Sequence, residues 1–111
     1  MTGVQTCALP IYNVAIGRDS LYNADNTSYN VAMGYRSLYS TTTGDYNTAV
    51  GYQTLYNNTT GVRNIALGYQ ALLSNTIGSN NIGIGYSSVQ ANTTGIGNIG
   101  LGYAKIGRAH V

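Results

Sequence analysis

The sequence predicts an all-β protein, a β-solenoid in which the chain winds into stacked coils of 17 residues. Three observations favour this class: one phrase recurs every 17 residues, glycine occupies the same phase of every repeat, and aliphatic residues flank a small residue beside it. No insertion or deletion interrupts the interval. The composition agrees, since only 7% of the 111 residues are charged, against about 25% in ordinary soluble domains.

Asparagine opens each repeat, and positions are numbered from it. The phrases read NVAIG, NVAMG, NTAVG, NIALG, NIGIG and NIGLG. Five complete units end at Tyr29, Tyr46, Arg63, Asn80 and Gly97, and a sixth has begun before the repeats stop. In a stack of coils we expect the asparagines to form a hydrogen-bonded ladder of amides. They are Asn13, Asn30, Asn47, Asn64, Asn81 and Asn98.

Positions two to four predict a short strand. Two aliphatic residues separated by one small residue show the period of two that is typical of a strand with one buried face. We expect the aliphatic residues, from Val14 and Ile16 in the first unit to Ile99 and Leu101 in the last, to point into the core.

Position five is glycine in every unit, which indicates a positive φ or a close approach of two backbones. These glycines are Gly17, Gly34, Gly51, Gly68, Gly85 and Gly102.

Position nine supplies a second inward anchor, and we expect it to lie on a second short strand. Its residues are Leu21, Leu38, Leu55, Leu72 and Val89. A threonine-rich segment and a glycine at position fifteen then predict a turn, with Thr27 replacing the glycine in the first unit. Positions six and ten predict two stacked tyrosine columns. These are Tyr35, Tyr52, Tyr69, Tyr86 and Tyr103, and then Tyr22, Tyr39 and Tyr56.

The two ends of the chain do not belong to the repeat. A GTG-started reading of a common sequencing-library adapter encodes residues 1–11 one for one, and the reverse complement of the stretch encoding residues 6–11 translates as residues 106–111. We therefore expect both ends to be adapter-derived and non-native, and residues 12–105 to form the β-roll. The chain's only cysteine, proline and histidine (Cys7, Pro10 and His110) lie in these ends.

Residues 12–105 show no pattern of catalytic or ligand-binding groups. They contain no histidine or cysteine for zinc or thiol chemistry. Their only carboxylates, three aspartates, fall in three different columns, so that no paired-carboxylate site stands out. A net charge of +2 does not indicate nucleic acid, and no apolar run approaches the roughly 20 residues of a membrane helix. We expect no enzyme activity, catalytic residue, cofactor, metal, nucleic acid or membrane insertion.

The predicted core is thin, with about three sizeable inward side chains per coil, and small cores need disulfides, metal or oligomerisation. Because residues 12–105 have no cysteine for disulfides and few metal ligands, we expect an oligomer with the aliphatic and tyrosine columns at its interface.

The phrases NVAIG, NVAMG and NTAVGYQTLYNNTTG resemble the head repeats of YadA-like trimeric autotransporter adhesins. They also resemble the repeats of phage tail fibres that end in an endosialidase-type chaperone domain. The resemblance covers residues 12–105. It implies a left-handed parallel β-roll and a homotrimer, located outside the cell on a bacterial outer membrane or a virion tail. The implied role is attachment to a host-surface receptor, matrix protein or glycan.

One threonine column precedes the glycine of the turn and is a candidate exposed row for binding. Its members are Thr42, Thr59, Thr76 and Thr93. Such a row also raises the alternative of an ice-binding or other single-chain β-solenoid. The column begins with Asp25, and no second column keeps a parallel rank of threonines, which favours the fibre.

Overall fold

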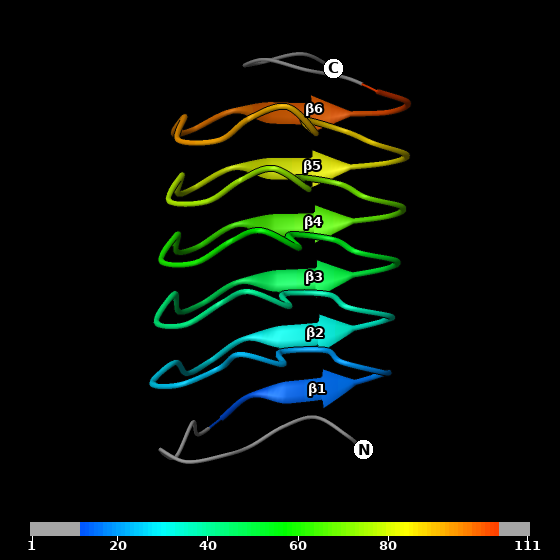
Figure 1. Ribbon diagram of the computed structural model, residues 1–111. Helices are drawn as coiled ribbons and strands as arrows, with labels where there is room; N and C mark the ends of the chain where they lie inside the picture. Colours follow the sequence, from blue (N-terminus) through cyan, green and yellow to red (C-terminus); the bar gives the residue numbers. More distant parts are fainter. Residues whose placement is uncertain (1–11, 105–111) are drawn as a thin grey trace.

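The computed structural model describes residues 12–104, and these form a β-solenoid without a helix. The coils stack along one axis, each contributing one short strand that points in the same direction as its neighbours (Figure 1). Residues 1–11 and 106–111, which we expect to be adapter-derived, lie outside the described residues. The strands are β1 Val14–Ile16, β2 Val31–Met33, β3 Thr48–Val50, β4 Ile65–Leu67, β5 Ile82–Ile84 and β6 Ile99–Leu101.

The strands form one parallel six-stranded sheet in sequence order. Each residue pairs with the residue 17 positions later, as Ala15 does with Ala32, and the same offset continues to β6. The predicted solenoid of 17-residue coils is therefore confirmed. A constant offset places chemically equivalent residues directly above one another along the axis.

The inner face of the sheet is lined by the small residue at position three. Ala32, Ala49 and Ala66 are completely buried. The aliphatic residues on either side point outward, and Ile16 is 55% exposed and Ile65 39% exposed. The prediction that positions two and four fill the core is wrong, because the opposite wall of the coil lies so close that only a methyl group fits beneath the sheet.

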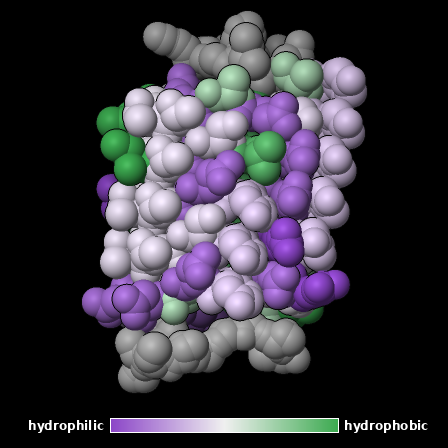
Figure 2. All heavy atoms as spheres, viewed as in Figure 1, coloured by the Kyte–Doolittle hydropathy of each residue, from purple (hydrophilic) through white to green (hydrophobic). Residues whose placement is uncertain are grey.

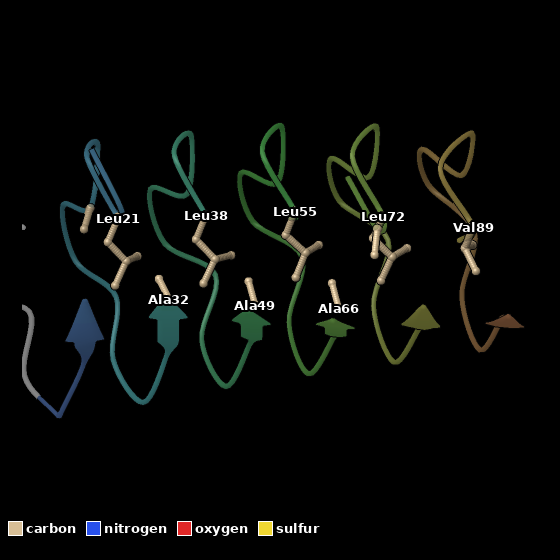
Figure 3. Close-up of a cluster of buried hydrophobic side chains, with 10 residues drawn as sticks. Leu21, Ala32, Leu38, Ala49, Leu55, Ala66, Leu72 and Val89 are labelled. Atoms are coloured by element: carbon tan, nitrogen blue, oxygen red, sulfur yellow. The ribbon is translucent and has the colours of Figure 1, made fainter. Parts of the chain in front are cut away.

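The opposite wall supplies the large core residue at position nine. Its side chains project across the coil onto the alanines, in one row along the axis (Figure 3). Leu38, Leu55 and Leu72 are fully buried, and Leu21 and Val89 are 2% and 1% exposed. This inward anchor is confirmed, so that each coil has one large core residue and one small one.

The segment that carries position nine is not a strand, contrary to the prediction. Its residues at positions seven and nine are left-handed, with φ of 53° at Gln53 and 51° at Leu55. Alternating left-handed residues curl the backbone too tightly for a strand. The segment still bonds to the next coil, because the Leu38 amide donates to the Thr54 carbonyl oxygen at 3.0 Å. A stack of hydrogen-bonded turns therefore forms the wall opposite the sheet.

Candidate interaction surfaces

The position-one asparagines tie each coil both to itself and to the next. The backbone amide of Asn64 donates to Oδ1 of Asn47 at 2.9 Å, and Nδ2 of Asn64 donates to the Gly78 carbonyl oxygen at 2.8 Å. Both asparagines are completely buried. The predicted ladder is confirmed, and its main partners are backbone groups rather than other amides. This column therefore has a structural role and is not a binding surface.

A second asparagine ladder at position twelve was not anticipated from the sequence. Nδ2 of Asn75 donates to Oδ1 of Asn58 at 2.9 Å and to the Gly78 carbonyl oxygen at 2.9 Å. Asn92 continues the ladder, its Nδ2 lying 2.8 Å from Oδ1 of Asn75. The sequence feature that could have predicted this second ladder is the 17-residue spacing of its asparagines. Asparagine occupies position twelve in three units, whereas the first two units have Ala24 and Thr41 there.

The position-five glycines meet both predicted requirements. Gly34 has a φ of +125°, and a Cβ placed on it would lie 2.5 Å from the carbonyl oxygen of Gly51. Side chains are excluded here because consecutive coils approach each other through their backbones.

The outer surface of the sheet is an aliphatic face made by positions two and four of the strands. It contains no charged residue, and Ile84 and Leu101 are 37% and 38% exposed. A continuous apolar surface of this kind is a candidate site of interaction. The aliphatic face consists of Val14, Ile16, Val31, Met33, Val50, Ile65, Leu67, Ile82, Ile84, Ile99 and Leu101, with Thr48 as its one polar residue.

All 11 tyrosines stand in stacked ladders. The predicted columns at positions six and ten are confirmed, and a third column at position seventeen was missed because it begins with Tyr12, ahead of the first unit. Ring centroids of Tyr29 and Tyr46 in this third column are 4.9 Å apart, with planes 3° from parallel. Because stacking uses the ring faces, the ladders turn ring edges and hydroxyls outward.

Arg36 joins two of these ladders. Its guanidinium carbon lies 5.1 Å from the ring centroid of Tyr35 and 5.2 Å from that of Tyr39. Its Nε donates to Oδ2 of Asp19 at 3.3 Å. This hydrogen bond is the main cause that raises the pKa of Arg36 above its ordinary value. The cluster fixes the corner of the solenoid between positions six and ten.

The candidate threonine row is only partly available to a ligand. Thr42, Thr59 and Thr76 are half-buried, and Thr93 alone is exposed. The hydroxyl of Thr59 donates to the carbonyl oxygen of Thr76 at 3.2 Å, and Thr76 donates in the same way to Thr93. The candidate row is therefore exposed only in part, because the hydroxyls of Thr59 and Thr76 serve as a ladder between coils. The face seen in Figure 2 is mainly hydrophilic or neutral, and similar residues recur from coil to coil.

Within residues 12–104, His, Cys, Asp and Glu nowhere form a group of three that could hold a metal ion. The same part of the chain has no helix long and apolar enough to cross a membrane. Fold and surfaces together define a β-solenoid held by polar and aromatic ladders, with an apolar outer sheet face. No family model matches the chain, and neither a curated protein nor a solved structure matches it.

Proposed function

We propose that the chain is a structural and adhesive repeat segment of a trimeric extracellular fibre, a bacterial surface adhesin head or a phage tail fibre, that attaches to a host surface. The observation that carries the proposal is the aliphatic face, which runs along all six strands without a charge. An apolar face of this length is stabilised when another apolar surface covers it.

A second copy of the chain is the partner that fits this face. Equivalent residues of the face recur once per coil, and a copy with a parallel axis has the same repeat. Ile65 and Ile82 of one copy then meet aliphatic residues of the other at every level. This matching along the axis keeps the copies in register.

The size of the face favours more than two chains. Six levels at about 4.8 Å and strands of three residues at about 3.3 Å each give an area on the order of 300 Å². Each partner of a stable interface buries about 800 Å². Three chains around one axis meet this need better than a pair, because each chain then buries surface against two neighbours instead of one.

The adhesive part of the proposal rests on repetition. The ladders make a stiff body, and every chain presents the same outward rows at each level. Three copies multiply these contacts, so that weak single contacts add up to firm attachment.

The mass of the full chain in solution, measured by light scattering after size exclusion, tests the assembly. We expect a trimer with a β-rich circular dichroism spectrum. Ile65→Lys places a charge in the middle of the face, and we expect it to give monomers that keep the β spectrum. The matched control is Thr60→Lys, which adds the same charge at an exposed turn residue and leaves the trimer intact.

A folded monomer from the unsubstituted chain contradicts the proposal. That result would favour the alternative, an ice-binding or other single-chain β-solenoid. For the adhesive part, immobilised matrix proteins and glycans are probed with the trimer. Binding to one class supports attachment, and no binding reduces the role to a spacer.

A further inference from the structure

The position-six tyrosines, Tyr35, Tyr52, Tyr69, Tyr86 and Tyr103, form the longest aromatic ladder. Ring centroids of Tyr52 and Tyr69 are 5.1 Å apart, and their planes differ by 4°. Tyr69 and Tyr86 are 4.8 Å apart with planes differing by 6°. Consecutive rings are therefore nearly parallel along the whole ladder, with centroids 4.8–5.3 Å apart.

The backbone holds these rings in register. The Gln70 amide donates to the Tyr52 carbonyl oxygen at 2.9 Å, and the Ser87 amide donates to the Tyr69 carbonyl oxygen at 2.8 Å. The rings are nevertheless accessible, because Tyr52, Tyr69 and Tyr86 are 43%, 41% and 48% exposed. A reagent in solution thus reaches phenols whose nearest reaction partners are already in place.

We propose that the position-six ladder is a site of oxidative cross-linking, at which a one-electron oxidant joins the tyrosines of consecutive coils as dityrosine. The oxidant takes one electron from each of two neighbouring phenols, and each phenol releases its hydroxyl proton. The two phenoxyl radicals form a carbon–carbon bond between ring carbons ortho to the oxygens. The hydrogens on those carbons then move to the oxygens and restore both phenols. The pair loses two electrons and two protons, which a peroxide accepts as it is reduced to water.

Composition directs the oxidation to the ladders. The chain has no tryptophan, and its one cysteine, Cys7, precedes the repeats. A radical on one ring has a parallel neighbour in the same chain, so that coupling within the ladder is faster than coupling that awaits an encounter between chains. The product closes a 17-residue loop and constrains the unfolded chain as a disulfide does.

The test is brief photo-oxidation of the full chain with a ruthenium bipyridyl complex and persulfate, followed by trypsin digestion and mass spectrometry. Trypsin cuts after Arg36, Arg63 and Lys105, which places Tyr52 in peptide 37–63 and Tyr69 in peptide 64–105. We expect these two peptides to be joined, with a combined mass lower by two hydrogens. We also expect the thermal midpoint of the cross-linked chain to rise.

Phenylalanine variants separate the ladder from general tyrosine reactivity. Tyr52→Phe keeps the stacked ring but lacks the phenol, and we expect it to reduce the joined product to the level of an unfolded control in guanidinium. Tyr46→Phe is the matched control, because Tyr46 lies in the same peptide, is 53% exposed and belongs to another ladder. It should leave the product unchanged. Equal product from Tyr52→Phe, or cross-links formed mainly between chains on a denaturing gel, would overturn the proposal.

Discussion

At the scale of single residues, the position-one asparagine is the side chain on which the coil most depends. Oδ1 of Asn64 accepts the Asn81 amide at 2.9 Å, and its Nδ2 donates to the Gly78 carbonyl oxygen at 2.8 Å. Asn64→Ala leaves both of these backbone groups without that partner, and we expect the free energy of unfolding to fall by about 3 kcal/mol. Urea denaturation followed by circular dichroism measures it.

Asn57→Ala is the control for this substitution. Nδ2 of Asn57 donates to the Leu73 carbonyl oxygen at 3.0 Å, but in an exposed position where water replaces the bond. We expect a change of less than about 1 kcal/mol. Equal losses from the two variants would show that burial of the amide does not set its contribution.

Position five requires glycine because its φ is positive and the backbone of the next coil leaves no room for a side chain. Gly34→Ala combines an unfavourable φ of +125° with a Cβ 2.5 Å from a carbonyl oxygen of the next coil, and we expect a loss of more than about 2 kcal/mol. Gly97→Ala has a φ of +73° but open space around the new Cβ, and we expect a loss of about 1 kcal/mol. Thermal unfolding of both variants checks the difference, and the reverse order would show that contact between coils is not what excludes a side chain.

At the scale of elements, the 17-residue repeat predicts which residues stack along the axis, but it does not predict which side chains point into the core. The constant interval was sufficient for the parallel register, the asparagine ladder and the inward leucine. The alternation Val31-Ala32-Met33 has two faces, and a period of two does not say which one is buried. Hydrophobicity alone places the larger residues inside, whereas the narrow coil admits only the alanine. The left-handed residues opposite the sheet had no sequence signal, because Gln53 and Leu55 are not turn-forming types.

The fifth coil differs from the first four in both of its core residues. Val89 is β-branched at a φ of 52°, a conformation unfavourable for such residues. The strand of the same coil carries Gly83 where earlier coils have alanine. Val89→Leu relieves this strain, because leucine is not β-branched, and we expect a gain of about 1 kcal/mol. The reciprocal change Leu55→Val should cost about 1 kcal/mol or more. Chemical denaturation measures both, and a loss in Val89→Leu would mean that this coil has no room for the larger side chain.

At the scale of the whole molecule, each strand pairs only with the strands before and after it in the sequence. The core follows the same rule, since the leucines form a single row along the axis (Figure 3). Stability is then a sum of coils and of contacts between neighbouring coils, and within residues 12–104 no contact joins the first strand to the last. The length of such a solenoid can change, but only by whole 17-residue units, which keep equivalent residues stacked on one another.

Deletion of one unit tests this rule. Removal of residues 47–63 joins Tyr46 to Asn64 and brings β2 beside β4 with every column intact. We expect an unchanged circular dichroism spectrum per residue and a slightly lower thermal midpoint, because one coil and one contact between coils are lost. Removal of residues 47–62 deletes one residue less and moves every later residue by one position. Since successive strand residues face opposite sides, the shorter deletion sets Ile65 level with Ala32 at the new junction, while the later coils keep their register with one another. We expect the two parts of the stack to unfold separately rather than in one cooperative transition. If both deletions were equally damaging, stability would depend on the full length of the stack and not on the register between adjacent coils.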